Sequence, residues 1–318
     1  MRPDEPSLAV EVAGVRLRNP VILASGTAGF SDELSDVLDL SRVGAVVTKS
    51  ITPLPREGNP TWRIIEASHH AGMLNAIGLA NPGIDAFVRD IAPRLAQAPT
   101  TVIGSAAGFS VEDYTAVCAQ FARIPALAAV ELNVSCPNVH GGCEFGADPG
   151  ALRQLVAGVK PVLEGRPLWV KLSPVPVGTK GHSMVDIAAA AVEGGADALC
   201  ISNTIPAMAI DPRTRRARLA NTTGGLSGPG VHPVAVKLVH DVYRALVRER
   251  GVPIIGIGGV MDWEDAAEFI LAGATAVEVG AALFADPRAP LKIVRGLGQW
   301  VRDQRRRSIG ELVGALEA

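Results

Sequence analysis

Two lysines stand where apolar runs of the sequence come to an end. Lys49 follows GAVVT at 44–48, and Lys171 lies in PLWVKLS at 167–173. A lysine at the end of a buried strand is costly unless it has a partner, so a role in a binding or catalytic site explains the pair better than a structural role. We therefore expect a lysine to lie close to a bound cofactor.

Two glycine-rich runs have the composition of a phosphate site. GIGG at 256–259 ends one apolar run, and VGAA at 279–282 ends the next. Glycine lets backbone N–H groups approach an anion closely. Each run alone is typical of a tight turn, but together, at the ends of the last two strands of a barrel, they predict a phosphate-bearing cofactor.

One of the four cysteines is placed for chemistry. Cys136 lies in ELNVSCPN, on a glycine-rich loop that continues VHGGCEFGADPG. Its thiol would serve as an acid or a base, whereas hydrolysis by a cysteine nucleophile would need a histidine, and His140 is the candidate on that loop. We expect Cys143 to be a spectator and Cys118 and Cys200 to be small core residues.

The composition is that of a globular chain with a large aliphatic core. Its 318 residues are 48% hydrophobic and 4% aromatic, and 30 Lys and Arg are balanced by 32 Asp and Glu. This balance disfavours nucleic acid as the main partner. No secretory signal or membrane span is recognisable, and the cysteine spacing predicts neither a disulfide framework nor a metal site. We expect a cytoplasmic protein that does not bind membranes.

Eight short apolar runs recur along the chain and end in small or polar residues. They are PVILASG at 20–26, GAVVTKS at 44–50, TTVIGSA at 100–106, LAAVELN at 127–133, PLWVKLS at 167–173, ALCISNT at 198–204, VPIIGIGG at 252–259 and TAVEVGA at 275–281. Continuous runs of this kind are typical of parallel strands buried on both faces.

Helical patterns fill most of the gaps between these runs. Ser110 and Asp113 resemble a capping box, and Asp148 precedes a proline at the start of another helix. Further helices are expected at about 83–97, 183–194, 233–249, 262–272 and 290–304. Eight strands alternating with helices predict a (β/α)8 barrel, with an N-terminal hairpin around Gly14 that closes its bottom. A doubly wound open sheet is the alternative, but no G-x-G-x-x-G follows an early strand.

The barrel interpretation brings the polar ends of the strands together at one mouth. The strand ends deliver Ser25, Lys49, Ser105, Asn133, Lys171, Asn203, Gly258, Gly259 and Gly280 to the same face. Three connections, at 51–82, 134–148 and 204–230, are too long for plain loops and follow strand ends, which is typical of functional loops. We assign residues 1–318 to one domain.

Several motifs occur in an order and spacing that resemble class 1 dihydroorotate dehydrogenases over nearly the whole chain. They are ASGTAGF, KSITPLPREGNP, GMLNAIGLANPG, ELNVSCPN, VKLSP, SNT, GGLSGPGVHPVAVKLV, IIGIGG and VEVGAA. NAIGL, SCPNVHGG and GGLSGP are more similar to the 1B branch than to 1A. The resemblance implies an FMN-containing (β/α)8 barrel that oxidises dihydroorotate to orotate in pyrimidine biosynthesis.

The resemblance also implies roles for individual residues. Cys136 would be the base that removes the C5 proton while the C6 hydride passes to flavin N5, and Lys171 would stabilise the anionic reduced ring near N1 and O2. The implied flavin contacts are Ser25, Lys49, Ser50, Ser105, Asn133, Lys171, Ser202, Gly228, Gly258, Gly259, Gly280 and Ala281. The implied substrate contacts are Lys49, Asn75, Ala76, Ile77, Gly78, Leu79, Asn133, Asn203 and Thr204.

Three of these positions depart from the family pattern. The family usually has Asn where Ser105 stands, a larger aliphatic residue where Ser202 stands and Thr where Ala281 stands. The departures bear on flavin packing and phosphate contacts, not on the location of the site. Trp62 and the neighbouring histidines of the segment 61–72 also differ from the usual version.

Partners and rival functions complete the expectations. The resemblance implies a homodimer, joined in a heterotetramer by an electron-transfer subunit that carries FAD and a 2Fe-2S cluster and passes electrons to NAD. A stand-alone enzyme with another oxidant fits the sequence equally well.

The alternative activity is that of a dihydropyrimidine dehydrogenase-like reductase of uracil or thymine. A tRNA-dihydrouridine synthase has only the arginine runs at 213–218 and 305–307 in its favour, and an inactive flavin-binding subunit is disfavoured by the intact Cys136, Lys49, Lys171 and Asn133.

Overall fold

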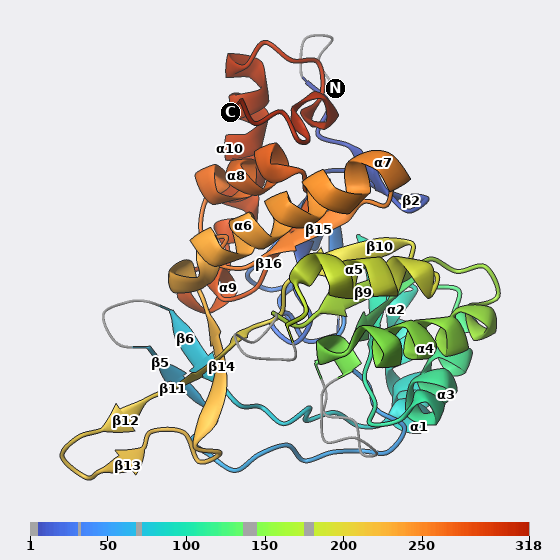
Figure 1. The fold of residues 1–318 in the computed structure, drawn as a ribbon, viewed down its shortest axis with the longest axis vertical. Coiled ribbons are helices and arrows are strands. Elements are labelled where there is room, and N and C mark those ends of the chain that lie inside the picture. The colour runs from blue at the N-terminus through green and yellow to red at the C-terminus, as the bar shows by residue number, and fades with distance from the viewer. Residues whose placement is uncertain (1–5, 31–32, 68–71, 136–144, 175–180, 318) are drawn as a thin grey trace.

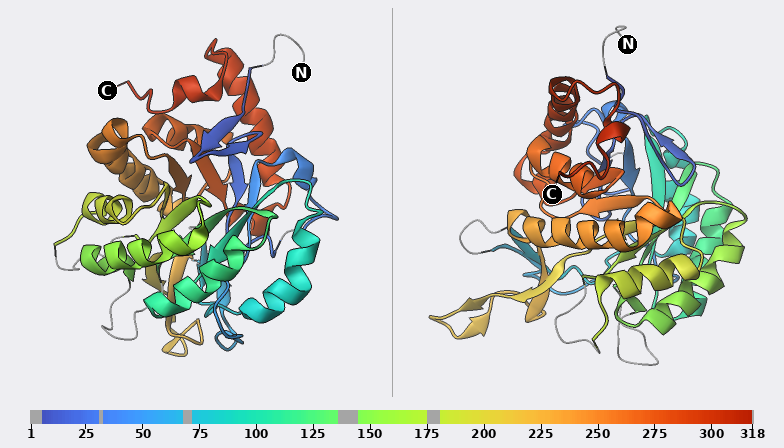
Figure 2. Two further views of the ribbon diagram at one scale, coloured as in Figure 1. Left: turned by 90° about the vertical axis from the view of Figure 1, so that its right-hand side faces the viewer. Right: turned by 45° about the horizontal axis from the view of Figure 1, so that its top comes forward.

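Eight parallel strands close into a barrel at the centre of the protein (Figures 1 and 2). The structure is a computed structural model that describes residues 6–30, 33–67, 72–135, 145–174 and 181–317. The barrel strands are β3 (Val21–Leu23), β4 (Ala45–Val47), β7 (Thr101–Ala106), β8 (Leu127–Asn133), β9 (Leu168–Leu172), β10 (Ala198–Ile201), β15 (Ile254–Ile257) and β16 (Ala276–Val279). Each of the eight predicted runs supplies one strand, so the predicted (β/α)8 barrel is confirmed.

The barrel strands are buried along almost their whole length, and the exceptions are Thr101, Ala128 and Asn133, which are partly buried. Every residue of β9 is buried, and Trp169 on that strand is fully enclosed. This burial on both faces explains why the runs are continuous and not alternating. The register sets Lys171 of β9 beside Asn133 of β8 and beside Cys200 of β10, which fixes their relative heights in the barrel.

Helices surround the barrel between the strands, as predicted (Figure 2). They are α3 (Val111–Ala122), α4 (Pro149–Val159), α5 (Met184–Glu193), α6 (His232–Val242), α8 (Trp263–Ala272), α9 (Ala282–Ala285) and α10 (Ala289–Asp303). The expected helix at 83–97 consists of α1 (Ile84–Ala86), a π-helical segment Phe87–Ile91 and α2 (Ala92–Leu95). The one at 233–249 continues from α6 through a π-helical segment Tyr243–Val247 into α7 (Arg248–Arg250).

The helix starts match their sequence signals with one difference. The Asp148 carboxylate accepts from the N–H of Ala151 at 2.9 Å, and Ser110 Oγ accepts from the N–H of Asp113 at 3.2 Å. The Asp113 carboxylate, however, accepts from the N–H of Phe109 at 2.9 Å and does not return to Ser110 as a capping box would. The Asp113 carboxylate therefore binds the N–H of the residue that precedes the N-cap residue Ser110.

The predicted N-terminal hairpin is formed by β1 (Val10–Val12) and β2 (Val15–Leu17). Its two turn residues, Ala13 and Gly14, both have positive φ, as a tight two-residue hairpin turn requires. Val12 and Leu17 are fully buried, and the chain passes from β2 directly into the N-terminal end of β3. The hairpin thus covers the barrel end opposite the strand ends that carry the predicted site.

Two of the long connections build a second sheet that the sequence did not predict. The strands β5 (Ile64–Glu66) and β6 (Met73–Asn75) from one loop join β11 (Ile205–Met208) and β14 (Thr223–Ser227) from another in the antiparallel order β11-β14-β6-β5. A ribbon of β12 (Ile210–Asp211) and β13 (Arg216–Ala217) projects beyond it (Figure 1). Across the described residues, no helix combines the length and apolar character needed to cross a bilayer.

Candidate active site

The C-terminal ends of the barrel strands open into a cavity of about 430 Å³. One wall is the barrel mouth, and the other is the four-stranded sheet, which contributes Ile64, Met73, Asn75 and Leu226. The volume falls in the range of roughly 300–1,000 Å³ that is usual for small-molecule sites. The long loops therefore form a structured wall over the barrel mouth.

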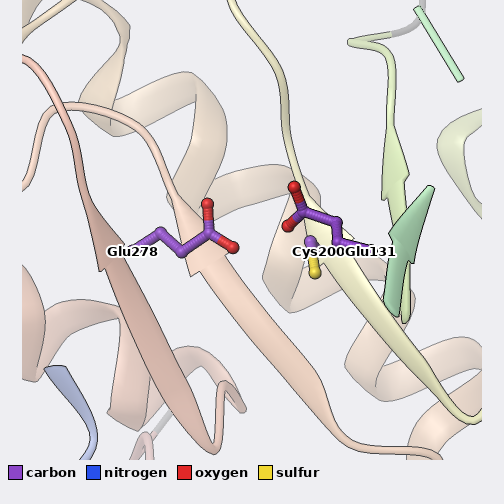
Figure 3. Close-up of side chains that lie close together, drawn as sticks. All are labelled: Glu131, Cys200 and Glu278. Atoms are coloured by element: carbon purple, nitrogen blue, oxygen red, sulfur yellow. The ribbon is translucent and has the colours of Figure 1, made fainter. Parts of the chain in front are cut away.

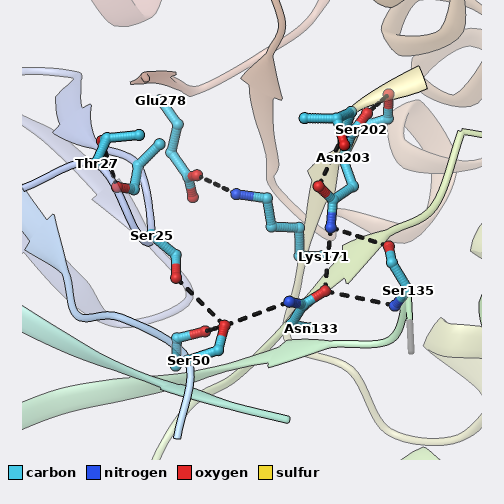
Figure 4. A network of polar contacts seen from close by, with 12 residues as sticks. Ser25, Thr27, Ser50, Asn133, Ser135, Lys171, Ser202, Asn203 and Glu278 are labelled. Carbon is cyan, nitrogen blue, oxygen red and sulfur yellow. Dashed lines mark hydrogen bonds and ion pairs between the residues drawn. The ribbon is translucent and has the colours of Figure 1, made fainter. Parts of the chain in front are cut away.

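Neutral amides and hydroxyls form a continuous hydrogen-bond network at this mouth (Figure 4). Nδ2 of Asn203 donates to Oδ1 of Asn133 at 3.0 Å and to Oγ of Ser135 at 2.9 Å. Nδ2 of Asn133 donates to Oγ of Ser50 at 3.3 Å, and Ser50 also contacts Oγ of Ser105 at 2.9 Å. Each amide is oriented by more than one partner, so the network presents a fixed set of donors and acceptors to a planar polar ligand.

A buried ion pair lies beside this network. Nζ of Lys171 is 2.9 Å from Oε2 of Glu278, and their side chains are 8% and 0% exposed. Burial alone would lower the pKa of Lys171, but its ion-pair partner Glu278 opposes this effect, and that pKa lies above its ordinary value. Lys171 lines the cavity as a permanent cation.

The glycine runs form close backbone turns at the same mouth. Gly228, Gly258 and Gly259 all have positive φ. A Cβ on Gly259 would lie 2.6 Å from the carbonyl oxygen of Gly228, so only glycine fits there. Nδ1 of His232 lies 3.0 Å from the Gly258 carbonyl oxygen, and this contact helps to hold the turn.

The structure brings most of the predicted site residues to this one cavity. Those that line it are Ser25, Lys49, Ser50, Asn75, Ile77, Leu79, Asn133, Lys171, Ser202, Asn203, Thr204, Gly228, Gly258, Gly259, Gly280 and Ala281. Ala76 and Gly78 belong to the same segment without lining it, and Ser105 is fully buried behind Ser50. Cys136, Cys143 and His140 lie outside the described residues.

Sequence reasoning missed several residues of this site. Glu278 lines the cavity and pairs with Lys171, and Arg63, Met73 and Phe284 line it from the wall and from α9. The signal for Glu278 is a carboxylate inside an otherwise apolar strand, AVEV, and Glu131 gives the same signal in AVELN. The other three lie on segments with no strand-end pattern to mark them.

Cys118 and Cys200 are buried free thiols, which confirms the prediction that they are core residues. Burial raises the pKa of both thiols. Cys118 faces the aliphatic core, whereas Cys200 lies next to the carboxylates of Glu131 and Glu278, a contact that the sequence did not indicate.

Comparison with known proteins agrees with the geometry. The family profile described as dihydroorotate dehydrogenase matches residues 7–301. This chain belongs to the dihydroorotate dehydrogenase family. A relative from Trichlorobacter lovleyi, named dihydroorotate dehydrogenase B (NAD(+)), catalytic subunit, is 46% identical over 98% of this chain and 99% of its own. Relatives of the same name from Geotalea uraniireducens and Geobacter sulfurreducens are 47% and 46% identical, with the same coverage. The predicted resemblance to the 1B branch of this dehydrogenase family is thereby confirmed.

Proposed function

We propose that this protein is the catalytic subunit of an FMN-dependent dihydroorotate dehydrogenase, which oxidises dihydroorotate to orotate in pyrimidine biosynthesis. The observation that carries the proposal is the set of side chains around one cavity, with Lys49, Lys171, Asn133 and Asn203 converging there in a chain of the dihydroorotate dehydrogenase family. We infer that residues 1–318 work as a single FMN-binding domain.

The residues present fit an FMN group. Positive φ at Gly228, Gly258 and Gly259 gives a backbone cradle that no Cβ fills, which suits a phosphate. Hydroxyl and amide groups are available for the polar edge of a ring system, and Lys171 supplies a buried positive charge. We assign the flavin contacts to the residues named for that role from the sequence, with Ser105 acting through Ser50.

When bound, FMN would supply the hydride acceptor that no protein side chain provides. Lys171 would stabilise the negative charge that develops in the transition state, where a fixed buried cation is most effective. Asn133, Asn203 and Thr204 would orient the planar substrate, and Lys49 would hold its carboxylate. Asn133, Asn203 and Thr204 are held by mutual hydrogen bonds before binding, so little reorganisation of these three residues is needed during reaction.

We assign proton removal from the substrate to Cys136. This assignment is supported by the sequence position of Cys136. It directly follows Ser135, whose Oγ accepts a hydrogen bond from Asn203 in the polar network. Cys136→Ser should retain FMN and lose orders of magnitude in the rate of reduction by dihydroorotate at neutral pH, since a serine hydroxyl is a poorer base. In the wild type this rate should rise with pH as the thiol ionises and then reach a plateau. Cys143→Ser is the matched control and should change neither FMN retention nor the rate of reduction. If Cys143→Ser slows reduction more than Cys136→Ser does, a group other than Cys136 removes the proton.

The electron acceptor belongs to the same proposal. The relatives are named as NAD(+)-dependent catalytic subunits, and that name implies a companion subunit. We propose a homodimer of this chain joined by an electron-transfer subunit that carries FAD and a 2Fe-2S cluster. Co-expression with such a subunit should give NAD reduction that this chain alone does not support.

The decisive experiment combines cofactor release with a substrate comparison. Denatured protein should release one FMN per chain, and the native protein should turn over dihydroorotate with an artificial acceptor. Uracil and thymine, tested with a reduced donor, should give no comparable turnover. Release of FAD, absence of flavin, or preference for uracil would each contradict the proposal.

A further inference from the structure

Three side chains meet inside the barrel (Figure 3). Glu131 on β8, Cys200 on β10 and Glu278 on β16 bring two carboxylate oxygens and a sulfur within 4.8 Å of one another. Each of them lies two positions before a residue at, or one position past, the end of its strand. Those later residues, which line the cavity, are Asn133, Ser202 and Gly280.

This cluster has more hydrogen-bond acceptors than donors. Oε2 of Glu278 accepts from Nζ of Lys171 at 2.9 Å. Among the described residues, no N–H or O–H group reaches Oε1 of Glu278 or either oxygen of Glu131, and all three atoms are buried. A buried carboxylate oxygen without a donor is strongly unfavourable, and buried polar groups in folded proteins almost always have partners. A proton bound within the cluster supplies a donor where none of the described N–H or O–H groups does.

The charges lead to the same conclusion. The titratable groups that face Glu131 are Glu278 from β16, Lys171 from β9 and Cys200 from β10. Lys171 balances one carboxylate, so two ionised glutamates would leave a net negative charge in the barrel interior. One bound proton makes the cluster neutral. Because Glu278 already accepts from Lys171, the proton belongs on Glu131.

We propose that Glu131 is protonated in the native protein and donates that proton to Oε1 of Glu278, while the Cys200 thiol donates to the other oxygen of Glu131. Every buried carboxyl oxygen of the cluster then takes part in a hydrogen bond, and Lys171, Glu278, Glu131 and Cys200 form one neutral chain of contacts. Glu131 is a positioning residue, since it acts on Lys171 through Glu278.

The pKa directions agree with this arrangement. Burial raises the pKa of Glu131 well above its usual range, and the Glu278 carboxylate beside it raises it further. Burial also raises the pKa of Cys200 well above that of a free thiol, which keeps the S–H proton available for donation. Both directions favour the protonated forms that this arrangement requires.

The consequence for chemistry rests on the proposed function. An ionised Glu131 would place an extra negative charge inside the barrel and oppose the negative charge of a reduced flavin. A protonated Glu131 leaves the charge of Lys171 balanced by one carboxylate only. The barrel interior is then neutral before reduction, and the positive charge of Lys171 would be available to a bound flavin as well as to Glu278.

The rival explanation of the same three atoms is a metal ion. A metal would need Cys200 as a thiolate, which the direction of its pKa shift opposes, and the adjacent Lys171 ammonium would repel a metal cation. Elemental analysis of the purified protein separates the two explanations. If the wild type contains a stoichiometric metal and Glu131→Gln has lost it, the proposal that Glu131 is protonated is wrong.

Infrared spectroscopy tests the proton directly, with or without flavin in the protein. At neutral pH the wild type should show the carbonyl band of a buried protonated carboxylic acid, shifted in deuterated water. Glu131→Gln should lack this band, and Glu249→Gln, on the exposed face of α7, should keep it. Absence of the band from the wild type, or its persistence in Glu131→Gln, would overturn the proposal even if the enzyme oxidises dihydroorotate as expected.

The flavin midpoint potential gives an independent measurement of the charge on Glu131. In Glu131→Gln the amide donates to Glu278 as the protonated acid does, so the potential at pH 7 should match the wild type. Glu278→Gln removes a negative charge and should raise the potential. If Glu131→Gln raises it equally, Glu131 is ionised and the proposal is wrong. Protein without flavin would contradict the proposed function, and the infrared result would still stand.

Discussion

The mouth and the interior of the barrel use polar groups in opposite ways. At the mouth, Asn133 and Asn203 are neutral, partly exposed and held by several hydrogen bonds each. In the interior, Lys171, Glu278 and Glu131 are charged or titratable, buried, and dependent on one another. Losing one bond from a redundant network is tolerated, whereas removing one member of a buried charge cluster leaves its partner uncompensated. Substitutions in the interior should therefore have larger effects than those at the mouth.

The largest effect is expected from Lys171→Ala. Removing a preorganised positive charge from beside the developing negative charge should slow flavin reduction by about 10²–10³-fold, on the scale of losing one oxyanion donor. Binding of dihydroorotate should change much less, because the charge is needed only as reduction proceeds. Rapid-mixing kinetics measures both quantities. Lys237→Ala, on the exposed face of α6, is the control and should change neither.

The dependence of stability on pH tests the interior in a second way. The folded-state pKa of Glu131 is raised above its unfolded value of about 4.3, so the folded protein binds one more proton between those two values. Its contribution is fully present below pH ~4.3 and is lost as pH rises toward the folded pKa. Relative to the wild type, Glu131→Gln should gain about 1.4 kcal/mol of unfolding free energy per pH unit across that window. Urea unfolding between pH 5 and pH 8 checks this, and parallel curves for the two proteins would contradict it.

The fold of the barrel was largely predictable because its signals are local. Each strand is a continuous apolar run, and caps such as Asp148 mark where a helix begins. The four-stranded sheet gave no such signal. Its strands β6 and β14 are short, and Leu74 pairs with Leu226 across about 150 residues of intervening chain. A pairing between two distant loops, one of them rich in glycine, cannot be found from periodicity within either.

Those residues of the site that follow strand ends were predictable, because they too have local signals in the sequence. Asn133 and Asn203 follow strand ends, where the barrel geometry brings them together, and the family resemblance named Asn75 and Thr204. Glu131 lies within a strand, where an isolated carboxylate looks like an interruption of the apolar run. The role of Glu131 becomes visible only when the barrel closes, because the strands β10 and β16 then bring Cys200 and Glu278 close to its carboxyl group.

A backbone change at the mouth should have an intermediate effect. Gly259→Ala forces a side chain onto a residue with φ of +67° and places Cβ 2.6 Å from the Gly228 carbonyl oxygen, so it should cost more than about 1 kcal/mol of stability and weaken FMN retention. Gly280→Ala is the matched control for stability. Its Cβ would meet Ala24 at an ordinary 3.4 Å. Equal destabilisation by the two variants would show that the turn at Gly259 tolerates a side chain.

The smallest effect is expected from Ser105→Ala, at the edge of the mouth network. Ser105 is fully buried and contacts Oγ of Ser50 at 2.9 Å, but it does not line the cavity. Ser50 keeps contacts to Asn133 at 3.3 Å and to Ser25 at 3.4 Å, so the variant should lose about 1 kcal/mol of unfolding free energy and little turnover. Denaturant unfolding and steady-state kinetics measure these separately. A large loss of turnover with unchanged stability would mean that Ser105 touches the cofactor itself, and that the mouth depends on single groups as strongly as the interior does.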